Sequence, residues 1–398
     1  MKWHILSVDD DPDIGRQIKE LLDGKIKKDG DELLVDAVQD FDIAMRNLDT
    51  MRYDLIILDV FKGKPSAGNT DRPGEEILQE IKKRCFMPAI FYTALPQKVS
   101  QYESSLVRIV HKTSGGTAKL KTEIIALIKT RLPEVNRHLI EHFFKVEAKY
   151  MWEFVEPNWH HFSKTGDAKS LAYLLARRLS TSFSRENIHN LISSLGGTTE
   201  QPCIKDEVHP IEYYIWPSVG EQCMTGDILS RKSKKVISYY VILTPSCDLV
   251  KNSQRQTKAE NVLLAECIPL PVTAEAKAWA KHTDVNTSEA KNTKGALKEF
   301  LKNRKKERYY FLPGTFFLPD LNVDMEAVYS IPFAQLQNFK KTATLDSPFA
   351  ECLLNRFSRY MGRVGIPELY ESEIERIIGN LKVSGKKSVS KKRQRKDY

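Results

Sequence analysis

Two short apolar stretches that end in aspartate decide the fold of the first part of this chain. Residues 3–11 have the sequence WHILSVDDD, and residues 55–59 have the sequence LIILD. Three more apolar runs, rich in β-forming residues, lie at 33–37, 89–92 and 106–110. Amphipathic stretches with helical spacing separate these runs, and strands buried on both faces are apolar throughout. The alternation predicts an α/β fold with a doubly wound, five-stranded parallel sheet.

Polar side chains stand at the ends of these predicted strands. Asp9 and Asp10 follow the first strand and Asp59 the third, while Thr93 ends the fourth and Lys112 the fifth. The carboxyl ends of parallel strands meet at one edge of the sheet, so we expect these side chains to converge. Neighbouring carboxylates repel one another unless a cation joins them, and hard oxygen ligands with room for water suit Mg²⁺. The alternative is that these residues only cap strands or lie on the surface.

The order of these elements resembles that of the receiver domains of response regulators in two-component signalling. The matching elements are Val8-Asp9-Asp10, Leu58-Asp59, Thr93-Ala94 and Lys112. The resemblance covers residues 1–132 and implies a flavodoxin-like fold. It also implies that Asp59 is the phosphoacceptor, which attacks a phosphohistidine and becomes an acyl phosphate. The partner is then expected to be a cognate histidine kinase or phosphotransfer protein.

The resemblance also implies roles for the residues around the phosphoacceptor. The implied Mg²⁺ ligands are Asp10 and Asp59 directly, Asp9 through water, and the backbone carbonyl of Phe61. Lys112 is expected to pair with one phosphoryl oxygen, and Thr93 to hydrogen-bond another. These roles suit a reaction that depends on positioning and on neutralisation of phosphoryl charge.

Three features depart from the family's pattern. Thr113 follows Lys112, where the family usually has proline, and Ile109 occupies the position of the aromatic switch residue. The loop from Val60 to Gly74 is several residues longer than usual. We expect the phosphoryl chemistry to survive these changes. Ile109 has no ring to swing inward, so we expect the long loop to close over the phosphoryl group in place of the usual aromatic signalling route.

A helical connector is expected over residues 133–198. Its first helix, at 134–156, has an apolar stripe too long to stay solvated, so we expect it to form a homodimer or to dock onto the receiver-like part. Helices at 168–181 and 185–195 are expected to follow. The segment 174–188 resembles a DNA-binding helix-turn-helix, but its turn is about two residues too long, so a connector is the better interpretation.

Residues 199–380 have the pattern of an α+β domain rich in strands, which we expect to be the output domain. The expected strands are 211–216, 236–243, 262–268, 309–312 and 328–331, with helices near 295–304 and 348–360. The favoured function is a two-component response regulator that switches this domain.

The alternative function is a phosphorylation-gated effector, such as a nuclease or another hydrolase in an anti-phage defence setting, or a DNA-binding regulator. Cys247 follows an expected strand, but no spacing supports His209 or His282 as its base. Asp227, Asp248 and Glu266 imitate part of a metal-dependent nuclease core, but no Glu-x-Lys element completes it. No convincing catalytic motif lies in this domain.

Most of the net charge of +9 lies near the end of the chain. Residues 382–398 carry eight lysines or arginines and one aspartate, so the other residues are nearly neutral together. We expect 381–398 to be a disordered basic tail, which either keeps the protein in solution or contacts nucleic acid. No apolar run approaches the roughly 18 residues of a membrane span. The six cysteines are scattered and no signal peptide precedes Asp9, so we expect a cytoplasmic protein without membrane contact.

Overall fold

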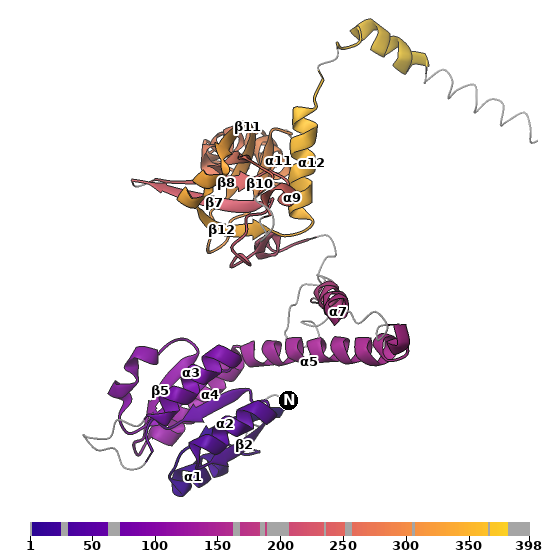
Figure 1. Cartoon of the computed structure of the whole chain (residues 1–398). Coiled ribbons are helices and arrows are strands. Elements are labelled where there is room, and N and C mark those ends of the chain that lie inside the picture. The colour runs from indigo at the N-terminus through magenta and orange to yellow at the C-terminus, as the bar shows by residue number, and fades with distance from the viewer. Residues whose placement is uncertain are drawn as a thin grey trace, which may run out of the picture. The chain divides into compact units, whose positions relative to one another are not determined.

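The chain forms two compact units in the computed structural model. The described residues are 2–24, 31–62, 72–161, 168–183, 188, 207–234, 236–250, 257–304, 307–364 and 367–380. The units are Met1–Ile204 and Lys205–Tyr398, and each contains one β-sheet (Figure 1). The expected basic tail, 381–398, lies outside the described residues.

The sheet of the first unit has five parallel strands. They are β1 (Lys2–Val8), β2 (Glu32–Val38), β3 (Leu55–Leu58), β4 (Ala89–Thr93) and β5 (Val107–His111). Their order is β2-β1-β3-β4-β5, and every pairing is parallel. All residues of β3 and β4 are buried, which explains their continuous apolar sequence. The predicted doubly wound sheet is confirmed, and its strand order is that of the flavodoxin-like fold.

Helices cover both faces of this sheet. They are α1 (Pro12–Leu22), α2 (Phe41–Thr50), α3 (Pro73–Arg84) and α4 (Gly116–Lys129). Leu58 lies in the core under α2 and α3, whereas its neighbour Ile57 lies in the core under α1 and α4. The two faces are filled in this way because successive side chains of a strand point in opposite directions. The connection from β4 to β5, a fully described segment, has two 3₁₀ turns, Pro96–Lys98 and Ser100–Tyr102, in place of an α-helix.

Two further helices belong to the first unit. The helix expected at 134–156 is present as α5 (Leu132–Tyr150), with proline in its first turn, and continues as the π-helical turn η3 (Met151–Val155). The helix expected at 168–181 is α7 (Ala168–Ser182). The helix expected at 185–195 lies outside the described residues apart from Ile188, and so does most of the second half of the helix-turn-helix hypothesis.

The second unit contains a seven-stranded sheet with the order β10-β11-β9-β8-β7-β12-β6. The strands are β6 (Tyr214–Ile215), β7 (Asp227–Ser233), β8 (Val236–Ile242), β9 (Asn261–Pro269), β10 (Tyr309–Leu312), β11 (Leu321–Pro332) and β12 (Lys340–Leu345). The helices are α9 (Ser246–Leu249), α10 (Ala274–Ala280), α11 (Ser288–Leu301) and α12 (Phe349–Met361). Each pairing is antiparallel, so the strand-rich α+β prediction is confirmed.

The structure corrects several element boundaries in the second unit. The strand expected at 211–216 is mostly a 3₁₀ helix, Pro210–Tyr213, because the side chain of His209 caps it and leaves only Tyr214–Ile215 in the sheet. The helix expected near 295–304 begins at Ser288, since the Thr287 hydroxyl accepts a hydrogen bond from Ala290 N. Strands β7 and β12 were not expected. None of the helices in the described part of the chain has the length and apolar character needed to cross a membrane.

Candidate functional site

Three aspartates meet at the carboxyl edge of the first sheet. Asp9 and Asp10 follow β1, and Asp59 follows β3, its neighbour in the sheet. One carboxylate oxygen from each lies within 4.8 Å of the others. Asp9 is only 3% exposed, while Asp10 and Asp59 are half-buried. The convergence predicted from the strand ends is therefore present for these three carboxylates.

Lys112 places a single ammonium group between two of these carboxylates. Its Nζ lies 2.7 Å from Asp9 Oδ2 and 2.6 Å from Asp59 Oδ2. Lys112 can reach both because its own backbone N–H bonds to Thr93 O at 2.9 Å, which continues the pairing of β5 with β4. A lysine at the end of β5 thus points back across β4 toward β3 and β1.

The charges at this edge perturb one another. Burial raises the pKa of Asp9 to about 6, against the opposing effect of Lys112 and with a further contribution from Asp59. For Lys112, burial alone would lower the pKa, but the carboxylates of Asp59 and Asp9 outweigh it, and the net shift is upward. Burial therefore outweighs the stabilising effect of Lys112 on the Asp9 carboxylate.

The carboxylate of Asp59 is held by hydrogen bonds to both of its oxygens. The backbone N–H of Val60 donates to Asp59 Oδ1 at 2.6 Å, and Lys112 donates to Oδ2. The sequence does not predict the Val60 hydrogen bond, because every residue type except proline has a backbone N–H to donate. The hydrogen bond from Val60 N holds the Asp59 side chain in one orientation.

Thr93 and Phe61 complete the set of residues expected here. Thr93 ends β4, is 1% exposed, and accepts a hydrogen bond from Leu95 N on its hydroxyl at 3.3 Å. Phe61 is buried in the core two residues after Asp59. The roles expected of the Thr93 hydroxyl and the Phe61 carbonyl remain predictions.

Gly74 supports the site and was missed by the sequence analysis. A Cβ atom at this position would lie 1.9 Å from the backbone oxygen of Asp59. No side chain fits at that distance, so the start of α3 approaches the end of β3 only because residue 74 is glycine. In the sequence, the glycine next to Pro73 at the start of an expected helix could have indicated a close backbone contact at this position.

The long loop before α3 is described only at its two ends. Residues 63–71 lie outside the described residues. Arg72, at the far end of the loop, forms an ion pair with Glu75 at 2.9 Å, and Glu75 also accepts a hydrogen bond from the Tyr102 hydroxyl at 2.9 Å. Arg72 is therefore tied to α3 and to the turn between β4 and β5, and the expected closure of the loop stays a prediction.

The candidate residues of the second unit do not form a comparable cluster. Asp227 is fully buried and pairs with Lys341 at 3.0 Å, and its other oxygen accepts a hydrogen bond from Thr344. Glu266 accepts a hydrogen bond from the Tyr329 hydroxyl. Among the described residues, the group that could hold a metal ion is the one at the edge of the first sheet. The nuclease-like arrangement of Asp227, Asp248 and Glu266 is not present.

Comparison with solved structures finds receiver domains that match the first unit. The response regulator TrrA of Thermotoga maritima, solved with Mg²⁺ and BeF, is 27% identical over 31% of this chain and 98% of its own, with a TM-score of 0.24. A Francisella receiver domain is 21% identical over 32% of this chain and 98% of its own, with a TM-score of 0.24. CheY4 of Vibrio cholerae is 19% identical over 32% of this chain and 100% of its own, again at 0.24.

Comparisons with protein-family models and with curated proteins found no match. The strand order of the first unit is that of the flavodoxin-like fold, as the resemblance noted in the sequence implied.

Proposed function

We propose that this protein is a response regulator that accepts a phosphoryl group on Asp59 with Mg²⁺ and thereby switches its carboxyl-terminal domain. The observation that carries the proposal is the placement of Lys112 Nζ within 2.7 Å of both Asp9 and Asp59, beside a third carboxylate from Asp10. Three carboxylates and one ammonium group at the end of a parallel sheet suit the binding of a divalent cation and a phosphoryl group.

The residues at this edge fit Mg²⁺. Their donor atoms are hard carboxylate oxygens, and the three groups lie close enough together for one cation to contact them all. The ligands in this proposal are Asp10 and Asp59 directly, Asp9 through water, and the backbone carbonyl of Phe61. The bound cation would supply charge neutralisation for the phosphoryl oxygens.

The chain's own residues would orient the nucleophile and stabilise the product. An oxygen of Asp59 attacks the phosphorus of a phosphohistidine, a P–O bond forms as the P–N bond breaks, and the leaving imidazole takes up a proton. The hydrogen bond from Val60 N keeps the Asp59 side chain in place. Lys112 then exchanges its contact with Asp59 for one phosphoryl oxygen, and the Thr93 hydroxyl hydrogen-bonds another. The donor is a histidine kinase or phosphotransfer protein, which implies action in the cytoplasm.

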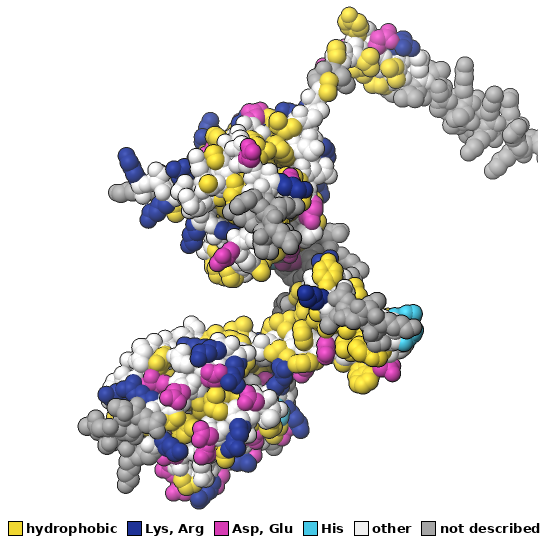
Figure 2. Space-filling view, in the orientation of Figure 1, with side chains coloured by type: hydrophobic (Ala, Val, Ile, Leu, Met, Phe, Trp, Pro, Cys, Tyr) yellow, Lys and Arg dark blue, Asp and Glu magenta, His cyan; other side chains and the backbone are white. Residues whose placement is uncertain are grey.

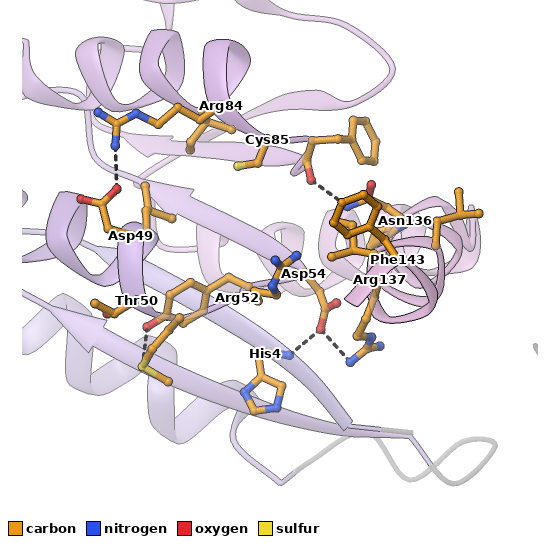
Figure 3. Close-up of a pocket in the computed structure, with 18 of the residues that line it drawn as sticks. His4, Asp49, Thr50, Arg52, Asp54, Arg84, Cys85, Asn136, Arg137 and Phe143 are labelled. Atoms are coloured by element: carbon orange, nitrogen blue, oxygen red, sulfur yellow. Dashed lines mark hydrogen bonds and ion pairs between the residues drawn. The ribbon is translucent and has the colours of Figure 1, made fainter. Parts of the chain in front are cut away.

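The contacts of helix α5 support the proposal that it carries the signal from the receiver to the carboxyl-terminal domain. Only Thr130 and Arg131 separate α4 from α5. Arg137 of α5 donates to Lys2 O at 2.8 Å. It also pairs with Asp54 at 3.3 Å, as Figure 3 shows. The side chain of Asn136 donates to Phe86 O at 3.3 Å. Residues 133–198 would therefore act as a connector fixed on the receiver, and 199–380 as the output domain.

A homodimer through the 134–156 helix is a further part of the proposal. A groove of about 900 Å³ lies between α5 and the base of the receiver, and Phe143 and Phe144 line it at 41% and 48% exposure. Trp152, beyond the groove, is 72% exposed. Aromatic groups at this level of exposure are stabilised when another surface covers them.

Acetyl phosphate tests the proposal directly. With Mg²⁺, the full chain should show a phosphate-dependent shift on phosphate-affinity gels, and Asp59→Asn should abolish it. Lys112→Met should reduce it strongly because the phosphoryl oxygen loses its ammonium partner. Asp42→Asn, which removes an exposed carboxylate in the first turn of α2, is the matched control and should behave as wild type. Equal shifts in wild type and Asp59→Asn would remove Asp59 from the mechanism.

A further inference from the structure

Strands β7 and β8 extend beyond the sheet of the second unit as a two-stranded ribbon. β12 pairs with β7 between Asp227 and Ser230, and β9 pairs with β8 between Tyr239 and Ile242. The residues beyond these limits, 231–233 and 236–238, pair with each other. No other strand of the described residues pairs with them. Figure 1 shows this end of β7 and β8 reaching out from the body of the unit.

The ribbon is strongly basic. From residue 228 to residue 247 the chain carries Arg231, Lys232, Lys234 and Lys235, and it has neither aspartate nor glutamate. Arg231, Lys232 and Lys234 are exposed, whereas Lys235 lies outside the described residues. Dark blue side chains mark the projecting end in Figure 2. This segment alone accounts for four positive charges in a chain whose net charge is +9.

These cations are not used to hold the fold together. Within the described part of the chain, no carboxylate lies within ion-pair distance of Arg231, Lys232 or Lys234. Arg231 rests over the ring of Phe339, with its guanidinium carbon 5.7 Å from the ring centre. Arg231 nevertheless remains exposed to solvent. By contrast, Lys341 on the neighbouring strand is committed to the buried Asp227.

Both faces of the ribbon carry positive charge. Arg231 lies opposite Ser238, and Lys232 lies opposite Ile237, so successive cations point to opposite faces. Lys234 occupies the turn, in the left-handed region with a φ of 52°. A partner that encloses the ribbon from both sides meets positive charge on each side.

We infer that this ribbon, residues 231–234 and 236–238, enters a groove of duplex DNA and contacts the phosphates on both sides. The major groove of B-form DNA is about 12 Å wide and admits a two-stranded β-ribbon. Lysine and arginine side chains on both faces would meet the two phosphate backbones that border the groove, and such contacts carry affinity without reading sequence. The deep groove of A-form RNA is too narrow for side chains to enter.

A membrane surface fits the ribbon less well. An inserted tip would place apolar side chains foremost, but the exposed Lys234 is at the turn. Val236 and Ile237 lie behind the turn, at 64% and 50% exposure, and they point to opposite faces because they are adjacent in a strand. They are placed to contact sugars and groove walls while the lysines meet phosphates. This inference does not depend on phosphorylation of Asp59.

Fluorescence anisotropy on the full chain tests the inference, with a labelled random-sequence duplex as the probe. The key variant is R231Q/K232Q/K234Q, which changes exposed residues and should keep the wild-type melting temperature. The matched control is K291Q/K298Q/K302Q, which removes three exposed lysines from and just after α11 in the same unit. The basic tail is identical in all three proteins, so differences between them isolate the ribbon.

We expect the ribbon variant to bind the duplex about tenfold more weakly than wild type at about 0.1 M salt, and its plot of log K against log salt to be shallower by about 2 to 3. The control should stay within about twofold of wild type. Equal binding by the ribbon and control variants would overturn the inference. So would wild-type binding to anionic vesicles but not to the duplex, or equal affinity for single-stranded DNA of the same length.

Discussion

Replacing the buried carboxyl of Asp9 should stabilise the first unit when divalent cations are absent. The pKa of Asp9 rises from its usual 3.8 to about 6 in the folded protein, chiefly through burial. The folded state therefore binds the proton more tightly than the unfolded chain does. Well below pH 3.8 the group is protonated in both states and carries no penalty; the penalty grows as the pH rises from 3.8 to about 6 and is complete above that value. A shift of about two pKa units corresponds to about 3 kcal/mol at full ionisation.

Asp9→Asn keeps the shape of the protonated acid and removes the charge. With a chelator present, it should raise the free energy of unfolding of the first unit by up to about 3 kcal/mol at pH 8, and by much less near pH 4. Lys112 keeps its contact with Asp59 in this variant. The assay is hydrogen exchange followed by mass spectrometry on peptides that contain β1 and β3, because it reports on this unit separately from the second.

Asp10→Asn is the matched control for this prediction. It removes one charge from the same edge of the sheet at a half-buried position, so the gain from reduced repulsion should be smaller than at Asp9. The reasoning is refuted if Asp9→Asn destabilises β1 and β3 at pH 8, or if it stabilises them equally at pH 4 and pH 8. A gain that does not depend on pH cannot come from the ionisation of Asp9.

Three other substitutions test separate parts of the structure. Gly74→Ala should lower the melting temperature and impair phosphoryl acceptance, because its Cβ would overlap the Asp59 carbonyl, and thermal melting with the gel assay measures both. Lys341→Met leaves the fully buried Asp227 without its cation and should cost about 3–5 kcal/mol in the second unit, measured by urea unfolding. Arg137→Ala should increase hydrogen exchange in the first turns of α5 and leave exchange in α4 unchanged; faster exchange in both helices would contradict a local role.

The parallel sheet and its acidic edge could be predicted from the sequence because each depends on a local pattern. A strand buried on both faces has to be apolar throughout, as Leu55–Leu58 is, and the residue after it has to reach the edge of the sheet. Once the strand ends are known, Asp9, Asp59 and Lys112 must lie near one another. The spacing of these three residues in the sequence does not by itself show that they are close in space.

The features that could not be predicted depend on contacts between distant segments. The requirement for glycine at position 74 comes from the backbone of Asp59, which only the packing of α3 against β3 brings close. Strand β7 was missed because its second half, 231–233, lies beyond the sheet and has no buried face to impose an apolar alternation. The π-helical turn after α5 leaves no mark on the apolar spacing that predicts the helix.

Mapping the phosphorylated residue tests the central claim most directly. Borohydride reduces an aspartyl phosphate to homoserine, and peptide mass spectrometry then locates the altered residue. After incubation of the full chain with acetyl phosphate and Mg²⁺, we predict conversion at Asp59 and at no other aspartate of the acidic edge, and no conversion when a chelator replaces Mg²⁺. Conversion at Asp9 or Asp10 would contradict Asp59 as the phosphoacceptor, and conversion at Asp59 to the same extent without Mg²⁺ would contradict the role of the cation.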